Sequence, residues 1–196
     1  MKPAWLIGIF AGVVLAVTVA GKYNSLVSAE ESVNTAYSQV QNVLQRQADL
    51  IPNLVETVKG YAAHESKTLI QVAEARSKVT ALSKIDPKDL ASNEDLQKKL
   101  IEAQATMNQA AISLNAVKEA YPQLQANDNF KSLMAELSGS INRVTVERMR
   151  AQKAVQSYNL DVRSFPGKIV ASVLGFSPKP YFQATDSAQS APTVKF

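Results

Sequence analysis

The stretch QRQADLIPNLVETVKGYAAHE, residues 45–65, has the apolar spacing of an amphipathic helix but carries Pro52 in its middle. Proline inside a helix removes one hydrogen bond and costs about 3 kcal/mol, so Pro52 either starts a helix or bends one. A start at Pro52 would make Ile51 the cap, and an isoleucine side chain cannot accept the unpaired N–H groups. We therefore predict a continuous helix that bends at Pro52 and reverses near Lys59 and Gly60, where glycine can adopt the left-handed conformation.

On both sides of this stretch, apolar residues recur at alternating steps of four and three. We call each such series a seam. The first seam consists of Val33, Tyr37, Val40, Leu44, Gln47, Ile51, Leu54, Val58, Tyr61, Glu65, Thr68, Val72, Ala75 and Val79, in which Gln47, Glu65 and Thr68 are the exceptions. Two further seams run from Leu96 to Leu124 and from Phe130 to Val162. This spacing is typical of long, coiled-coil-like helices packed at about 20° to one another. No stretch alternates with period two, so we predict an all-α fold.

The breaks between the seams divide the chain into four helices. Asp86 and Pro87 form a turn signal, and Ser92 has the position of a cap for the next helix. Pro122 ends that helix, and Asn127 or Asp128 caps the following one. The predicted helices cover roughly 22–60, 64–84, 92–121 and 127–164. Their short connections predict an up-and-down antiparallel four-helix bundle. A break at Pro52 would keep the number of helices and divide the first two differently.

An uncharged stretch, Ala4 to Gly21, precedes the first seam. At a rise of 1.5 Å per residue it spans about 27 Å, enough for the hydrocarbon core of a bilayer. Trp5 and Tyr23 stand where interfacial aromatic residues are found. We expect residues 1–22 to form a transmembrane anchor that contacts the lipid bilayer through residues 4–21. A cleaved signal peptide is the alternative.

Small residues recur every four positions within this stretch, at Ala4, Gly8, Gly12, Ala16 and Ala20. Such a stripe lets two helix backbones approach closely, so we expect a homo-oligomer that associates through it. Lys2 and the terminal amine lie before the span and Lys22 lies after it. The excess of one positive charge favours an extracytoplasmic bundle, with the N-terminus inside.

Composition narrows the function. The 196 residues are 46% hydrophobic and 19% charged, with a net charge of +4 and no cysteine. A small positive excess gives no reason to expect nucleic acid. The chain carries no glycine-rich phosphate loop and no GxSxG or HExxH motif, so we expect no cofactor, no bound metal and no catalytic residues.

The residues after the last seam form two segments. GKIVASVLGFSPKPYF, residues 167–182, suggests a short apolar helix closed by Gly175 and then an extended, proline-containing segment. This piece could lie on the bilayer surface, but its single Lys168 gives little of a basic face, so we expect it to cover one end of the bundle. We predict a helical bundle over 23–182 and a disordered tail over 183–196.

A few charged residues are candidates for a role beyond packing. Arg46 and Asp49 are three positions apart beside Pro52, and with Asn53 they could form a partner-docking spot at the bend. His64, the lone histidine, and Glu65 could serve a metal-dependent hydrolase, although a metal needs more ligands than these.

Glu65 and Arg148 are charged residues in otherwise apolar seams. Because a buried, unpaired charge is costly, we predict that they meet in the core as an ion pair.

Several of these stretches resemble the LemA family of bacterial membrane-anchored helical proteins. They are YNSLV (23–27), Arg46, DLIPNLVETVKGY (49–61), His64–Glu65, YPQL (121–124), Phe130, Asn142–Arg143, YN (158–159), FP (165–166), Gly175–Phe176 and Tyr181–Phe182. Family members usually carry Tyr-Asn where this chain has Ala151–Gln152. The resemblance implies a single-pass protein of the bacterial cell (inner) membrane, with a helical bundle and no established catalytic activity. Some relatives are linked to specialised membrane compartments.

The sequence therefore favours a non-enzymatic membrane scaffold whose bundle oligomerises and organises a membrane patch or protein partners that remain to be identified. A peripheral lipid-binding or membrane-remodelling module is the first alternative. A metal-dependent hydrolase that uses His64 and Glu65 is the second, and the sequence supports it less.

Overall fold

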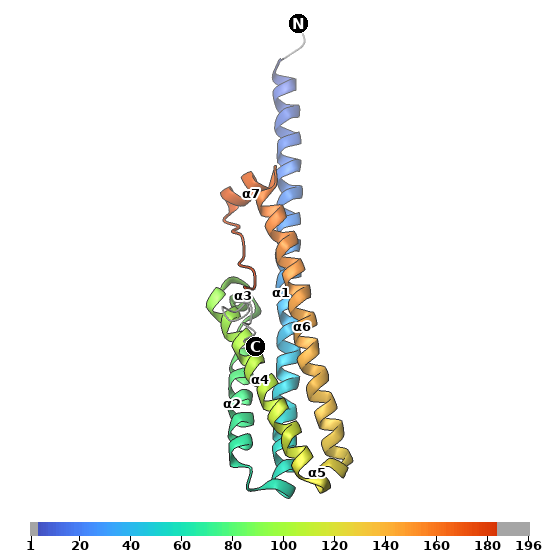
Figure 1. Cartoon of the computed structure of the whole chain (residues 1–196). Helices are drawn as coiled ribbons and strands as arrows, with labels where there is room; N and C mark the ends of the chain where they lie inside the picture. The colour runs from blue at the N-terminus through green and yellow to red at the C-terminus, as the bar shows by residue number, and fades with distance from the viewer. Residues whose placement is uncertain (1–3, 184–196) are drawn as a thin grey trace, which may run out of the picture.

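The computed structural model describes residues 4–183, and this range is all-helical, as the seams predict. The helices are α1 (Ala4–Ala62), α2 (Ser66–Ser83), α3 (Pro87–Ser92), α4 (Glu94–Ala120), α5 (Pro122–Ala126), α6 (Asp128–Arg163) and α7 (Gly167–Leu174). The four long helices α1, α2, α4 and α6 lie lengthwise side by side, and the N-terminal part of α1 projects beyond them as a stem (Figure 1).

Helix α1 has 59 residues and joins the predicted span to the first seam without interruption. Pro52 lies inside it, as predicted. The reversal comes later than expected, because α1 continues past Gly60 to Ala62. The lone positive φ of the described glycines belongs to Gly175, so Gly60 does not adopt the left-handed conformation. The N–H of Glu65 donates to the carbonyl of Ala62 (3.1 Å), and α2 begins one residue later.

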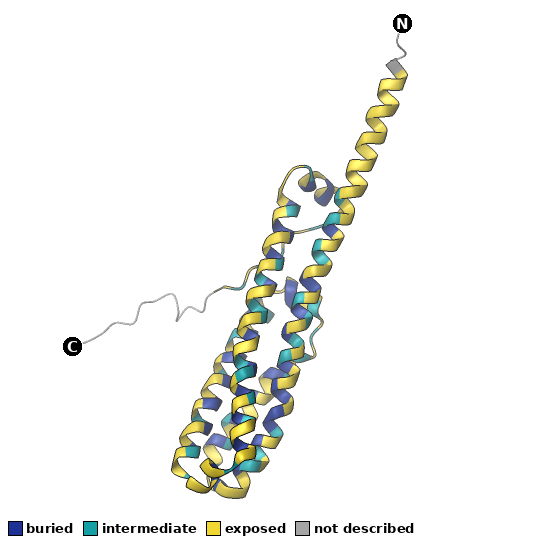
Figure 2. Ribbon diagram, turned by 90° about the vertical axis from the view of Figure 1, so that its right-hand side faces the viewer, coloured by how far each residue is buried: buried dark blue, intermediate teal, exposed yellow. Residues whose placement is uncertain are grey.

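The seams form the core. Every position of the first seam from Val33 to Val58 is buried, including Gln47, whereas Tyr61 near the helix end is 42% exposed. The buried apolar residues make one cluster that begins at Leu26 and ends at Ala171. Figure 2 shows them on the inner faces of the long helices, with exposed residues outside. Packing one face of each helix against the others is what period-3.5 spacing dictates.

The start of α4 differs from the prediction by one residue. Ser92 ends the short helix α3, and Asn93 is the cap of α4. The Asn93 Oδ1 atom accepts from the backbone N–H of Asp95 (2.9 Å) and of Leu96 (3.2 Å). Asparagine suits this position because its side-chain oxygen satisfies N–H groups that have no partner within the helix.

The connection after α4 contains a second short helix, α5, which begins at Pro122. Asn127 then caps α6, as predicted, and its Oδ1 accepts from the N–H of Phe130 (2.9 Å). Both α3 and α5 lie where the sequence analysis expected plain loops, and each has proline in its first turn, where the missing N–H does no harm.

After α6 the chain turns back, and α7 packs against both α1 and α6. Gly167 makes this possible: a Cβ atom there would lie 2.1 Å from the backbone oxygen of Asp161. Gly175, with φ of 82°, ends α7 as predicted. The described residues that follow, 175–183, are here named the C-terminal strap, and they run extended back along the long helices toward α3 (Figure 1). The predicted tail, 183–196, lies outside the described residues except for Gln183.

Candidate functional site

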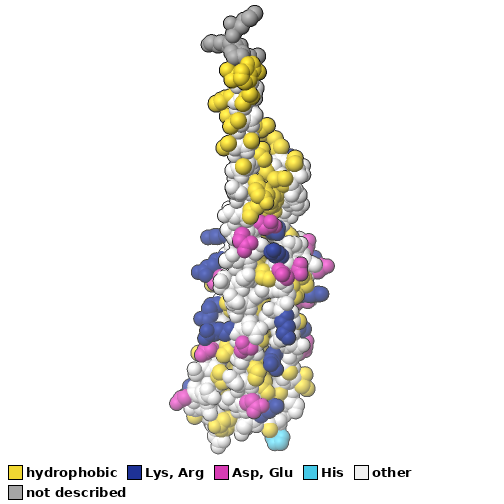
Figure 3. All heavy atoms as spheres, turned by 180° about the vertical axis from the view of Figure 1, so that it is seen from behind, with side chains coloured by type: hydrophobic (Ala, Val, Ile, Leu, Met, Phe, Trp, Pro, Cys, Tyr) yellow, Lys and Arg dark blue, Asp and Glu magenta, His cyan; other side chains and the backbone are white. Residues whose placement is uncertain are grey.

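The stem, the part of α1 before Lys22, is an exposed apolar surface. An 18-residue window of α1 near the N-terminus has a mean hydropathy of 1.9 and no buried residue. Helix α1 is thus long and apolar enough to cross a membrane, and a helix pairs its backbone groups internally, as a bilayer requires. Figure 3 shows hydrophobic side chains over the stem and the region beside it, with charged side chains on the lower part of the molecule.

Within residues 4–183, the stripe of small residues on this stem is exposed from Gly8 onward. Gly8, Gly12, Ala16 and Ala20 are exposed, and Ala4 is the first residue of the helix. A Cβ atom added at Gly8 or Gly12 would meet no heavy atom within 4 Å. The stripe is therefore free to pack against another helix.

The surface around Pro52, the predicted docking spot, exposes Arg46 and Asp49, and each has its own partner. Arg46 Nη2 lies 3.3 Å from Glu136 Oε2 of α6, and Asp49 Oδ1 accepts from Gln45 Nε2 (2.8 Å). Arg46 and Asp49 thus make two separate contacts, because Arg46 reaches the neighbouring helix. Asn53 is exposed beside Pro52.

The structure separates Glu65 and Arg148, so the predicted ion pair does not form. Glu65 lies just after α1 and accepts from the hydroxyl of Tyr121 (3.1 Å), a bond that raises the pKa of that phenol. Arg148 lies 4.7 Å above the ring of Phe182, which in turn stacks on Tyr37. Tyr37 marks the level of Arg148, and it lies about 37 Å from the C-terminal end of α1 at 1.5 Å per residue. Glu65 lies just beyond that end, so Glu65 and Arg148 are far apart along the molecule.

Arg148 is instead enclosed by aromatic side chains. Burial lowers the pKa of its guanidinium, and burial raises the pKa of the Tyr37 phenol beside it. The Phe182 ring that offers its face to this cation belongs to the C-terminal strap. The seam pattern could not reveal this partner, because the strap is extended and has no helical period.

His64 is exposed in the turn between α1 and α2. Within residues 4–183, no three His, Asp or Glu side chains gather closely enough to hold a metal ion. Glu65, the other half of the hydrolase hypothesis, is engaged with Tyr121.

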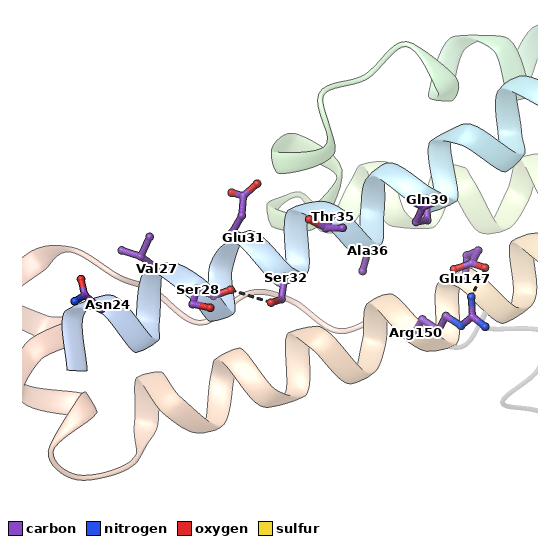
Figure 4. Close-up of a pocket in the computed structure, with 10 residues that line it drawn as sticks. All are labelled: Asn24, Val27, Ser28, Glu31, Ser32, Thr35, Ala36, Gln39, Glu147 and Arg150. Atoms are coloured by element: carbon purple, nitrogen blue, oxygen red, sulfur yellow. Dashed lines mark hydrogen bonds and ion pairs between the residues drawn. The ribbon is translucent and has the colours of Figure 1, made fainter. Parts of the chain in front are cut away.

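A surface groove of about 690 Å³ between α1 and α6 was not predicted from the sequence. Ser28, Ser32 and Ala36 of α1 line it with small side chains, and the Ser32 hydroxyl donates to the Ser28 carbonyl (2.8 Å). The ion pair of Glu147 and Arg150 on α6 (2.7 Å) borders one side (Figure 4). Small residues on one helix face permit close approach of another helix.

The C-terminal strap is held on α6 by side-chain amides, which sequence reasoning also missed. Asn159 Nδ2 donates to the Lys179 carbonyl (2.9 Å), and the Lys179 N–H donates to Asn159 Oδ1 (2.8 Å). Two helical turns earlier, Gln152 Oε1 accepts from the N–H of Phe182 (3.2 Å). Gln152 lies in the pair that departs from the family pattern, and it still holds the strap.

The lysine of the strap also reaches other elements. Lys179 Nζ lies 3.0 Å from Glu30 Oε1 on α1, and its side chain is 10% exposed. The hydroxyl of Tyr158 donates to the Ser177 carbonyl (3.0 Å). The strap thus ties α6 to α1.

Comparison with known proteins identifies the family of this chain. The LemA family model matches residues 36–196. Magnetosome protein MamQ 2 of Paramagnetospirillum magneticum is 25% identical over 192 residues, which is 91% of this chain and 71% of that protein. Magnetosome protein MamQ of Magnetospirillum gryphiswaldense is 24% identical over 190 residues, covering 90% of this chain and 70% of its own. Protein LemA of Metamycoplasma hominis is 24% identical over 167 residues, which is 85% of this chain and 71% of that protein. Since the family model spans most of its length, this chain belongs to the LemA family.

Proposed function

We propose that this protein is a non-enzymatic, single-pass membrane scaffold, in which residues 4–21 cross the bilayer and carry the helical domain on a rigid stem. The observation that carries the proposal is the exposed apolar surface of α1 before Lys22, which continues without a break into the core helix of the domain. An apolar helix exposed on all sides is stable in lipid and costly in water.

The domain that stands on this stem is an up-and-down four-helix bundle of coiled-coil-like helices, over residues 23–182. Support comes from the contacts: α1 packs against α2 and α6, α2 against α4, and α4 against α6. Short connections between successive long helices reverse the chain each time.

Self-association through Gly8, Gly12, Ala16 and Ala20, joined by Ala4, is the scaffold's means of assembly. The stripe is unpartnered within the chain, and lipid-exposed helices associate where small residues let their backbones meet. The groove lined by Ser28, Ser32 and Ala36 continues on the same helix below the span, where a second copy could add contact.

Location and partners complete the proposal. The protein stands in the bacterial cell (inner) membrane with the bundle on the extracytoplasmic side, following the charge difference across the span. A protein partner docks on the exposed surface of Arg46, Asp49 and Asn53 beside Pro52, and nucleic acid plays no part. Three relatives named magnetosome proteins and one named Protein LemA carry no enzyme name, which is consistent with a scaffold.

The anchor is tested by carbonate extraction of membranes. The full chain should stay in the membrane pellet, and a variant that lacks residues 1–21 should be released. Release of the full chain would overturn the anchor, whereas shortening of the mature protein by about 20 residues would show that the segment is a signal peptide.

Assembly is tested by chemical crosslinking in membranes. Gly8→Ile with Gly12→Ile should abolish the crosslinked oligomer, since the added side chains meet nothing within the monomer and block only a second helix. Leu6→Ile, on the opposite side of the helix from Gly8, is the matched control and should leave the oligomer intact. An oligomer that survives the double substitution excludes the stripe as the interface.

The enzymatic alternative has a direct test. Metal analysis of the purified protein and of His64→Ala should find no stoichiometric metal in either. A metal bound by the parent and lost from the variant would favour the hydrolase.

A further inference from the structure

The connection between α6 and α7, together with α7 itself, forms a second apolar surface, residues 163–174, here named the hairpin. Its exposed side chains are large: Phe165 is 83% exposed and Val173 is 77% exposed. Ile169 and Leu174 are exposed beside them. The buried residues of α7, such as Val170 and Ala171, face the bundle. Helix α7 is therefore apolar on both sides, which differs from a helix that only covers a core.

Two contacts fix the level of the hairpin relative to the stem. The Ser25 hydroxyl donates to Asp161 Oδ2 (3.4 Å), so these positions of α1 and α6 lie side by side. Because α6 runs antiparallel to α1, its last residue, Arg163, reaches about 3 Å further toward the N-terminal end of the stem. At the far end of α7, the ring of Phe176 packs edge-on against that of Tyr23 (6.1 Å). The hairpin between these two points therefore lies beside the uncharged stretch that ends at Gly21.

A hollow between the stem and the hairpin confirms this level. Its volume is about 510 Å³, and its lining includes Val14, Thr18 and Val19 of α1 with Phe165 and Ile169 of the hairpin. The Thr18 hydroxyl donates to the carbonyl of Val14 (2.8 Å), so it needs no other partner. If residues 4–21 lie in a bilayer, the side chains across this hollow are at the same depth as the last turns of the span (Figures 1 and 3).

Two cations belong to the hairpin. Arg163 and Lys168 are exposed, and within residues 4–183 neither has an acidic side chain within ion-pair distance. They line a second hollow with Ala171 and Phe176. Cations on long stems beside apolar side chains are typical of the interface between lipid headgroups and acyl chains.

We propose that the hairpin is a second membrane contact, in which Phe165, Ile169, Val173 and Leu174 enter the lipid beside the span while Arg163 and Lys168 meet the headgroups. This inference rests on the proposed membrane anchor. The occupant of the apolar surface is lipid, because the surface is continuous with that of the stem and lies at its level. The hairpin then fixes how deeply the domain sits against the bilayer and prevents it from tilting away.

The chain has no cysteine, so single cysteines can report the environment of each site. Ile169→Cys and Val173→Cys probe the hairpin, and Leu15→Cys probes the span. Ile70→Cys, at a position of α2 that is 66% exposed, is the control in water. Each full-length variant is labelled with a fluorophore, placed in phospholipid vesicles, and exposed to lipids with a nitroxide near the headgroup or to iodide in the water.

The labels at 169 and 173 should be quenched by the nitroxide lipid and protected from iodide, as should the label at 15, while the label at 70 should show the reverse. Iodide quenching at 169 and 173, with 15 still in lipid, would overturn the hairpin insertion and leave the anchor standing. Protection from both quenchers would show that protein covers the surface, which also overturns it. If iodide quenched the label at position 15 while the labels at 169 and 173 were in lipid, the proposed span would be refuted and the lipid contact of the hairpin would stand.

Discussion

At the scale of single residues, the buried polar side chains decide which helices meet and in what register. Gln47 occupies a seam position that the sequence pattern marks as a misfit, and it is fully buried. The structure gives it a partner across the core: Gln104 Nε2 donates to Gln47 Oε1 (3.0 Å), and Gln47 Nε2 donates back (3.4 Å). The pattern could show that Gln47 faces inward, but Gln104 lies outside the second seam, so the pair itself was hidden.

We expect Gln104→Leu to lower the free energy of unfolding by about 2 kcal/mol, because it leaves the buried Gln47 amide without its partner. Adding Gln47→Leu should restore most of the loss, since replacing both members of a buried polar pair with apolar residues is close to neutral. Chemical denaturation followed by circular dichroism measures both. Gln109→Leu, exposed on the same helix, is the control and should change stability by less than about 0.5 kcal/mol. Equal stability of Gln104→Leu and the parent would contradict the pairing.

The phenol of Tyr158 gives a pH-dependent prediction. Burial, and to a smaller extent the charge of Glu30, raises its pKa to about 12, whereas an unfolded tyrosine ionises near pH 10. A raised pKa in the folded state stabilises the fold below pH 10, and this contribution disappears as the pH rises from about 10 to about 12. Tyrosine ionisation can be followed by ultraviolet absorbance as the pH is raised. The Tyr158→Phe variant should lack one tyrosine that ionises near pH 12 in the parent protein. If the parent and the variant differ only near pH 10, the phenol is not shielded.

At the scale of elements, the long helices and the ends marked by Asn127 and Gly175 could be predicted from the sequence, whereas the short helices and the contacts of the strap could not. Apolar periodicity found α1, α2, α4 and α6 and the residues they bury, because burial of one face repeats every turn. It missed α3 and α5, because a helix of so few residues is too short to show an apolar period. It also missed the attachment of the strap, which depends on the amides of Gln152 and Asn159 rather than on apolar spacing. Arg148 was paired wrongly for the same reason, since its aromatic neighbour Phe182 lies in the strap.

Helix α1 continues through Pro52, so its backbone has no N–H to offer the carbonyl of Ala48, one turn earlier. We expect Pro52→Ala to restore this bond and raise the free energy of unfolding by about 1–3 kcal/mol, measured by denaturant unfolding. Asn53→Ala, exposed on the same turn, controls for helix propensity and should add no more than about 0.7 kcal/mol. A loss of stability in Pro52→Ala would mean that Ile51 and Leu54 reach the core only because the proline bends the helix.

At the scale of the whole molecule, one helix carries two kinds of surface. The part of α1 before Lys22 is apolar on all sides, and the part after Leu26 buries a single face. The change occurs within a few residues, without a loop, so the domain cannot swing freely on its stem. The C-terminal strap reinforces this by packing against α1 at Tyr23, Glu30 and Tyr37. A continuous helix of this kind transmits the orientation of the span to the bundle, which a flexible linker would not.

The core nevertheless begins below the span, and this leads to a prediction about folding. The first member of the core cluster is Leu26, so a chain that lacks residues 1–21 keeps every buried apolar residue of the described range. Such a chain should be mostly helical by circular dichroism and should unfold in one cooperative transition, because a single core unfolds as a unit. Its melting temperature should match that of the full chain in mild detergent, which is the control for effects of the detergent on the domain. A broad, non-cooperative transition in the shortened chain would show that contacts between the stem and the hairpin, rather than the seams, hold the helices together.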